Sequence, residues 1–183
     1  RYNISENDSG NLVRFSGVPT NTLIHNNTIY AKPTMDNRRT PGDPPRIVFH
    51  KDWQGWSDGV RFFNNLVYNA SPQARYEFGQ SRHNHYAHNL FFGEHPPGEP
   101  VDAFKCVADP GFTGRPGRAG PGREAAIAVY SLQADSPALH AGVPLPGHPD
   151  RDFAGRPIRP VNGRIPVGAL GPVAPPSATR TQP

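Results

Sequence analysis

The sequence predicts an all-β fold, a parallel β-helix built from coils of about 24 residues. The first observation is a repeat: four similar segments are centred on Asn3, Asn27, Asn65 and Asn89. The intervals between these asparagines are 24, 38 and 24 residues, so the middle interval equals one repeat with an insertion of 14. A period in this range is typical of a solenoid, in which each repeat packs only on its neighbours.

The second observation is the pattern around each asparagine, which indicates strands. Apolar residues alternate before the asparagine, as at Val60 and Phe62, and another apolar residue follows two positions after it, as at Val67. Alternation that is interrupted by one polar residue predicts a strand, a tight turn and a second strand. An asparagine tolerates the left-handed turn conformation, and its amide can both donate and accept hydrogen bonds in a stack. We therefore expect Asn27, Asn65 and Asn89 to form one buried column, with neighbouring Cα atoms about 4.8 Å apart.

A third strand is expected in each coil, at residues 12–16, 46–50 and 75–79. Alternation in these segments predicts that Phe15, Phe49 and Phe78 form a second column inside the solenoid. The outward positions are then Leu12, Arg14 and Ser16 on the first strand, Arg46, Val48 and His50 on the second, and Arg75, Glu77 and Gly79 on the third.

The 14 inserted residues fall into two loops, at residues 31–45 and 50–59. Both loops flank the expected strand 46–50, so we expect them to form two walls beside its outward face. A groove is predicted between them, because loops on a rigid scaffold are where functional residues concentrate.

We divide the chain into coils at 1–95, degenerate last coils with an irregular C-terminal cap of the same domain at 96–171, and a tail at 172–183 that is disordered by composition. Residues 127–130 are expected to form a last strand. Arg1 falls in the middle of a coil, and solenoids need end caps, so we expect N-terminal coils of the same chain to pack on this one.

The composition limits the kinds of partner that the chain is expected to bind. The net charge of +4 comes from 16 Arg and only 3 Lys, and Arg suits anionic ligands through bidentate contacts. One cysteine excludes an intrachain disulfide, and no apolar run is long enough for membrane insertion. The loop 114–123, rich in Gly, Pro and Arg, is interpreted as a solvated insertion, so no nucleic-acid partner is predicted.

The asparagine coils at residues 1–5 and 25–30, together with the closing region, resemble bacterial right-handed parallel β-helix proteins of the pectate-lyase-like superfamily. The motifs that carry the closing resemblance are Asp-Pro-x-Phe at 109–112, Tyr-x-Leu at 130–132, Ser-Pro-Ala-Leu-His-Ala-Gly at 136–142, Asp-x-x-Gly-x-Pro at 152–157 and Val-Gly-Ala at 167–169. The chain departs from the pattern at His140, where Asp is usual, and at Ile158, which is interposed before Arg159. The resemblance covers about residues 1–170.

The resemblance implies a secreted or cell-surface protein that acts on carbohydrate, often an acidic polysaccharide, bound along one parallel sheet between loop walls. The sequence supplies candidates for such a site. The candidate residues are His50, Lys51, Arg75 and Glu77 for catalysis, and Arg46, Asp52, Trp53, Trp56 and Asp58 for substrate binding. Trp rings offer flat apolar area on which sugars stack.

Three functions stay open on these residues. In a lyase, which we favour over a hydrolase, His50 or Lys51 is the base, and Arg46 or Arg75 neutralises the uronate carboxylate. A hydrolase needs two carboxylates, Glu77 with Asp52 or Asp58. A non-catalytic module for polysaccharide binding or surface attachment is the alternative, and there the charges form only a paired, solvated ladder. A groove that holds a base of lowered pKa favours an enzyme, whereas a flat, fully paired face favours the module.

The sequence indicates no certain cofactor, although calcium is possible. His83, His85 and His88 are close in sequence, but no Cys or acidic residue stands at ligand spacing, so no metal site is predicted.

Overall fold

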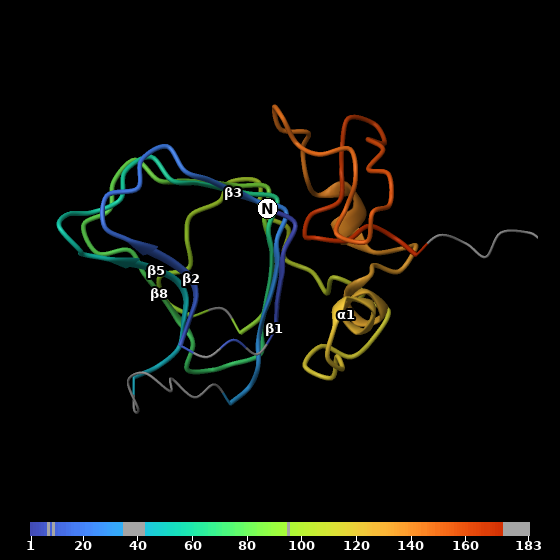
Figure 1. Cartoon of the computed structure of the whole chain (residues 1–183), viewed down its shortest axis with the longest axis horizontal. Coiled ribbons are helices and arrows are strands. Elements are labelled where there is room, and N and C mark those ends of the chain that lie inside the picture. Colours follow the sequence, from blue (N-terminus) through green and yellow to red (C-terminus); the bar gives the residue numbers. More distant parts are fainter. Residues whose placement is uncertain (7, 9, 35–42, 95, 174–183) are drawn as a thin grey trace, which may run out of the picture.

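The computed structural model describes residues 1–6, 8, 10–34, 43–94 and 96–173. Figure 1 looks along the axis of a β-solenoid, with a C-terminal lobe beside it. The strands form three parallel sheets that run along the solenoid. The β1 sheet contains β1 (Ile4–Glu6), β4 (Thr28–Ala31), β7 (Leu66–Asn69) and β10 (Leu90–Gly93). The β2 sheet contains β2 (Asn11–Ser16), β5 (Arg46–Lys51) and β8 (Arg75–Glu77), and the β3 sheet contains β3 (Leu23–His25), β6 (Arg61–Phe63) and β9 (His85–Ala87). The predicted parallel β-helix is confirmed.

The asparagine column is also confirmed. The side-chain Nδ2 of Asn27 donates to Oδ1 of Asn65 at 2.8 Å, and its backbone N–H donates to the same oxygen. Asn65 makes the same pair of bonds to Asn89, and Asn3 makes them to Asn27. The buried amides are therefore paired from coil to coil, which removes the cost of burying them.

The expectation that the ladder asparagine itself takes the left-handed turn conformation is wrong: the residue before each ladder asparagine turns the chain between two strands. Tyr2, Asn26, Asn64 and His88 all have φ between 51° and 57°. We call these four residues the turn column. Asparagine is over-represented in this left-handed region because its short polar side chain bonds locally, which explains the Asn-Asn pairs of the second and third coils.

A short segment after β10 covers the C-terminal end of the solenoid. Asp102 takes the next position of the ladder, where its Oδ2 accepts from both the backbone N–H and Nδ2 of Asn89. Cys106 then forms a parallel bridge with Leu90. The expected degenerate coil is thus reduced to one ladder residue and one bridge.

The interior of the solenoid is a single apolar core. Ile29, Val67 and Phe91 point inward from the β1 sheet, as the pattern after each asparagine predicted, and they meet Phe62 and Tyr86 of the β3 sheet.

The expected inner column of phenylalanines is wrong at its middle position. Strand β5 pairs Val48 with Val13 and His50 with Phe15, so Phe49 points outward beside Arg14. The expectation that Val48 and His50 point outward is therefore wrong as well. A bulge between β5 and β8 leaves Ile47 as an extra residue, and both Ile47 and Val48 are buried. A bulge adds one residue to one strand and so reverses the alternation beyond it.

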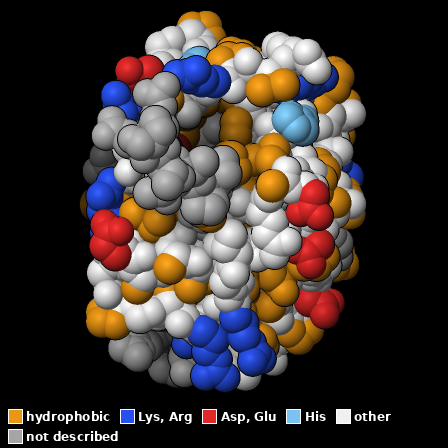
Figure 2. Space-filling view, turned by 90° about the vertical axis from the view of Figure 1, so that its right-hand side faces the viewer, with side chains coloured by type: hydrophobic (Ala, Val, Ile, Leu, Met, Phe, Trp, Pro, Cys, Tyr) orange, Lys and Arg blue, Asp and Glu red, His pale blue; other side chains and the backbone are white. Residues whose placement is uncertain are grey.

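The C-terminal lobe packs along the side of the solenoid, against the outer face of the β1 sheet (Figure 1). Leu66 and Leu90 of that sheet share one hydrophobic cluster with Tyr130, Leu132 and Leu170 of the lobe. The C-terminal cap expected from sequence is therefore a lateral cover over one sheet. Figure 2 shows the lobe side, where hydrophobic and uncharged atoms predominate, with one cluster of Lys and Arg at the bottom and further charged side chains around the periphery.

The turn column anchors the lobe. The amide of Asn64 pairs with the backbone of Val143 in both directions, and Nδ2 of Asn26 donates to the carbonyl of Pro166. Inside the lobe, Asp152 accepts from the backbone N–H groups of Arg156 and Gly171. These bonds give the closing motifs a structural role.

The lobe contains the two helical elements of the described chain, α1 (Arg123–Tyr130) and a 3-10 helix (Pro137–His140). The strand expected at residues 127–130 is wrong, because these residues form the last turn of α1. No helix among the described residues combines the length and the apolar character that crossing a membrane requires. Most of the tail, residues 174–183, lies outside the described residues.

Candidate functional site

The outer face of the β2 sheet is the candidate site. Its strands are aligned so that Arg46 lies beside Arg75, and Phe49 lies between Arg14 and Glu77. The next outward-pointing residue of β5 after Phe49 is Lys51, which lies beside Ser16 of β2. The expected neighbourhood of Arg46, Arg75 and Glu77 is confirmed, since neighbouring parallel strands lie about 4.8 Å apart.

Glu77 binds both arginines. One carboxylate oxygen of Glu77 accepts from Nε of Arg46, and the other lies 3.1 Å from a terminal nitrogen of Arg75. Arg46 also reaches Asp43, at 3.2 Å, from the end of the loop before β5. Partial burial alone would lower the pKa of Arg46, but its hydrogen bonds to Glu77 and Asp43 raise it overall. Arg46 is thus a fixed cation in a paired network.

Arg75 is the more open of the two arginines. Its side chain is 42% exposed, compared with 11% for Arg46. Its Nε is buried and has no hydrogen-bond partner among the described residues, so the exposed part of the side chain lies elsewhere on the guanidinium and its stem. Arg75 is therefore the arginine that an added anion can approach, whereas Arg46 is largely committed to its carboxylates.

Phe49 is a member of the site that sequence reasoning placed in the interior. The guanidinium carbon of Arg46 lies 4.6 Å from the centre of its ring, and that of Arg14 lies 5.9 Å away. Cations over a ring face are attracted by its quadrupole, and this attraction holds an aromatic side chain on an outer face. The sequence contained no signal for this outward orientation of Phe49, because Ile47, Val48 and Phe49 are all apolar and any of them could point into the solenoid.

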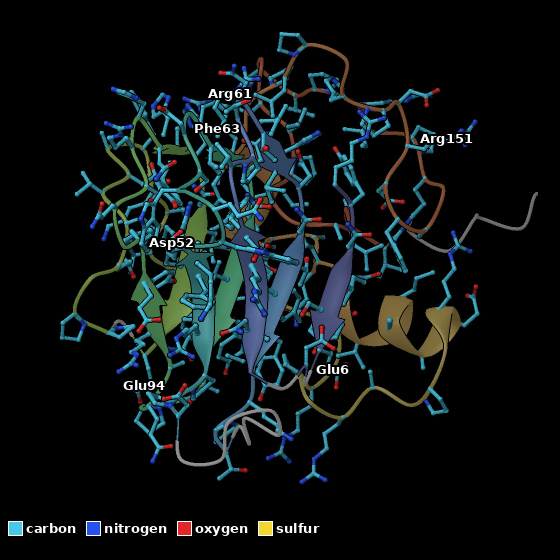
Figure 3. All side chains as sticks on the ribbon, turned by 60° about the vertical axis from the view of Figure 1, so that its left-hand side comes forward. Glu6, Asp52, Arg61, Phe63, Glu94 and Arg151 are labelled. Atoms are coloured by element: carbon cyan, nitrogen blue, oxygen red, sulfur yellow. The ribbon has the colours of Figure 1, made fainter. Side chains whose placement is uncertain are left out.

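The loop that follows β5 carries most of the other candidates. Lys51 and Asp52 are exposed, and Oδ1 of Asp52 accepts from the backbone N–H of Gly55 to close a turn. Trp53 is 66% exposed. Figure 3 shows Asp52 in this loop, away from Arg61 and Phe63 on the β3 sheet.

Trp56 takes a different position from Trp53. Its ring lies directly over Gly79, so closely that a Cβ at Gly79 would sit 1.9 Å from a ring carbon. Only glycine allows this contact. Trp56 therefore packs against the end of the β8 segment, while Trp53 remains the open aromatic ring of the pair.

Asp58 lies at the corner between the β2 and β3 sheets. It forms isolated parallel bridges with Thr20 and Arg82, and its Oδ1 lies 2.7 Å from Nδ1 of His83. Asp58 is thus paired within its own corner.

His50 is inside the solenoid and 1% exposed. Its ring stacks on Phe15 at 4.5 Å between centroids, and its ring nitrogens meet the hydroxyls of Ser57 and Tyr86. Burial lowers the pKa of His50 to about 4, so the imidazole is neutral at pH 7. The expectation that His50 lines the outer face as a base is wrong.

The two predicted walls are described unequally. Residues 35–42, the centre of the loop 31–45, lie outside the described residues, so the groove itself stays a prediction. On the described part of the chain, no group of three or more His, Cys, Asp and Glu residues is arranged to hold a metal ion.

No protein-family model matches the chain, and no curated protein matches it.

Proposed function

We propose that this chain is a non-catalytic β-helical module that binds an acidic polysaccharide along the outer face of the β2 sheet. The observation that carries the proposal is the charge of that face. Its strands present four cations, Arg14, Arg46, Lys51 and Arg75, and one carboxylate, Glu77. A row of cations that outnumber the carboxylates on the same strands suits a polymer that carries carboxylates at regular intervals.

Two aromatic rings support a sugar ligand over a simple anion. Phe49 lies beside two arginines, and Trp53 is exposed in the loop that follows β5. Flat apolar area beside cations matches an acidic sugar, which has an apolar ring face and a charged group.

The chemistry of the face favours binding over cleavage. Of the three predicted carboxylates, Glu77 is shared by two arginines, Asp58 pairs with His83, and Asp52 closes a turn. A hydrolase needs two carboxylates free to act on one bond. With His50 in the interior, Lys51 is the remaining candidate base for a lyase.

Membership of the right-handed pectate-lyase-like superfamily and a secreted or cell-surface location belong to the same proposal. They rest on the closing motifs, which hold turns of the lobe through residues such as Asp152 and Ser136.

The test is binding of polygalacturonate, with neutral dextran as the comparison polymer. We expect polygalacturonate to bind and the affinity to fall as salt is added, because exposed charge pairs are screened. Arg75→Ala should weaken binding about fivefold, which corresponds to about 1 kcal/mol. Arg61→Ala is the matched control, since Arg61 is an exposed arginine on the β3 sheet; it should leave binding unchanged.

Equal effects of the Arg75 and Arg61 variants would contradict the proposed face. Release of shortened, unsaturated fragments that is lost in Lys51→Ala would identify a lyase and overturn the non-catalytic assignment.

A further inference from the structure

A mostly apolar cavity lies where the lobe meets Tyr2 of the turn column. Its volume is about 370 Å³. Tyr2 forms one wall, and every other lining residue comes from one stretch of the lobe, residues 152–172. Small-molecule sites typically have volumes of about 300 to 1,000 Å³, and an apolar cavity of about 150 Å³ holds benzene. The cavity is therefore large enough for a molecule with two fused rings.

The walls of the cavity carry aliphatic and proline side chains. They include Pro157, Ile158, Val161, Pro166, Leu170 and Pro172. Val161 is 51% exposed, whereas Leu170 is 2% exposed and belongs to the cluster that the lobe shares with the β1 sheet. The lining therefore extends from the surface of the lobe to its interior, and a bound apolar molecule would remove this surface from water.

The charged groups around the cavity favour an anion. The carboxylate of Asp152 is already satisfied, because it accepts from the backbone N–H groups of Arg156 and Gly171 and lies 3.2 Å from Nε of Arg156. Arg156 also donates to the carbonyl of Pro172. Arg159 is exposed, and no described residue forms a hydrogen bond or an ion pair with it. Of the described lining residues, Arg159 is therefore the cation that remains for a ligand.

Gly171 leaves part of the cavity open because it has no side chain. A Cβ at this position would lie 3.7 Å from Oδ2 of Asp152 and 3.9 Å from Cγ of Pro166, and both of these residues line the cavity. These are ordinary van der Waals distances, and Gly171 does not have a positive φ. A side chain at residue 171 would therefore start between two lining residues without straining the backbone.

We propose that this cavity binds a small aromatic carboxylate, with its rings between the proline and aliphatic side chains and its carboxylate at Arg159. The flat apolar rings match the lining, and the carboxylate matches the unpaired guanidinium at the rim. A rigid two-ring body also loses less conformational freedom on binding than a flexible acyl chain of the same size. This inference does not depend on the polysaccharide proposal, which concerns the outer face of the β2 sheet.

The test is a calorimetric titration of residues 1–183 with 2-naphthoate and with 2-naphthalenemethanol, which keeps the rings and lacks the charge. We expect 2-naphthoate to bind with a dissociation constant on the order of 0.1 mM. The alcohol should bind about fivefold more weakly, because an exposed ion pair contributes only modestly. In NMR spectra, the backbone amides of Leu170 and Gly171 should shift when 2-naphthoate is added, whereas those of β8 should not.

Substitutions can separate the cavity from its charge. Gly171→Leu places a side chain in the cavity and should weaken binding of both compounds by about tenfold or more. Arg159→Gln should weaken binding of 2-naphthoate about fivefold and leave binding of the alcohol unchanged. Arg151→Gln is the matched control, since Arg151 is an exposed arginine of the same lobe that does not line the cavity; it should leave binding of both compounds unchanged.

A second filling variant keeps the test decisive if Gly171→Leu does not fold. Val161→Trp fills the cavity from its exposed rim, where a larger side chain is tolerated, and should weaken binding of both compounds in the same way. The proposed site is overturned if 2-naphthoate does not bind, or if the folded filling variants bind it as tightly as the parent chain does. Equal affinity for the alcohol, or tighter binding of octanoate, would overturn the choice of an aromatic carboxylate.

Discussion

The β1 sheet and the β2 sheet are formed by the same coils and have opposite outer faces. On the β1 sheet, the rings of Tyr30, Tyr68 and Phe92 follow one another at 5.2 and 4.8 Å between centroids, and the lobe covers this face. On the β2 sheet, Phe49 lies among arginines, and Figure 1 shows the lobe on the opposite side of the solenoid from β2, β5 and β8. The inward residues of both sheets are mostly apolar, so the outward residues decide whether a sheet carries a lobe or faces a ligand.

The largest expected effect is on stability at the β1 sheet. Leu66 is fully buried on its outer face and contacts the lobe near Gly168. Leu66→Ala should cost about 3 kcal/mol in the free energy of unfolding, because the cavity lies in a shared core. Phe49→Ala at the outer face of the β2 sheet should cost below about 1 kcal/mol, the scale of a cation–π contact at a partly exposed site. Urea unfolding of both variants measures the difference, and equal costs would refute it.

The second largest expected effect is a loss of stability at acid pH, caused by His50 on the inner face of the β2 sheet. The pKa of His50 is lowered to about 4 in the folded chain, whereas an exposed histidine titrates near 6.5. Between these values the unfolded chain binds a proton that the folded chain does not, so stability is full above about pH 6.5 and falls as the pH decreases toward 4. The loss should reach about 3 kcal/mol.

Hydrogen exchange can localise this loss. Protection of β5 should fall at pH 4.5 before protection of β7, whose inward residue Val67 cannot titrate. His50→Phe places a third ring between Phe15 and Phe78 and should reduce the pH dependence, although it leaves the Ser57 hydroxyl without its partner. A parent chain that keeps its full stability from pH 7 to pH 4.5 would contradict the assignment.

The smallest expected effect on stability is at Glu77. Glu77→Gln removes both ion pairs but leaves Arg46 its contact with Asp43, so the cost should be about 1 kcal/mol or less. Binding of polygalacturonate should strengthen, because two arginines lose their internal carboxylate. Weaker binding in a calorimetric titration would show that Glu77 orders the arginines for the ligand, and that the pairing itself is part of the site.

Much of the solenoid was predictable from the chain because it depends on local pattern. The asparagine spacing determines the coil length and the position of the ladder, although the left-handed residue of each turn lies one position earlier than the sequence indicated. A run such as Leu66-Val67-Tyr68, apolar at every position, also indicates a strand that is buried on both faces. The sequence therefore contained a signal that the outer face of the β1 sheet is covered. The alternating Arg75-Tyr76-Glu77 indicated the open side of the β2 sheet in the same way.

What the sequence determined by itself was the repeat, because each coil repeats the same short-range rules of alternation and turn formation. The tertiary structure decided which way the side chains of β5 point and which outer face of the solenoid the lobe covers. The bulge in β5 turned His50 inward and Phe49 outward, and the packing of residues 123–130 against the β1 sheet made them a helix. Both outcomes depend on contacts between residues far apart in the chain, and such contacts override local preference wherever several local patterns are nearly equal in energy.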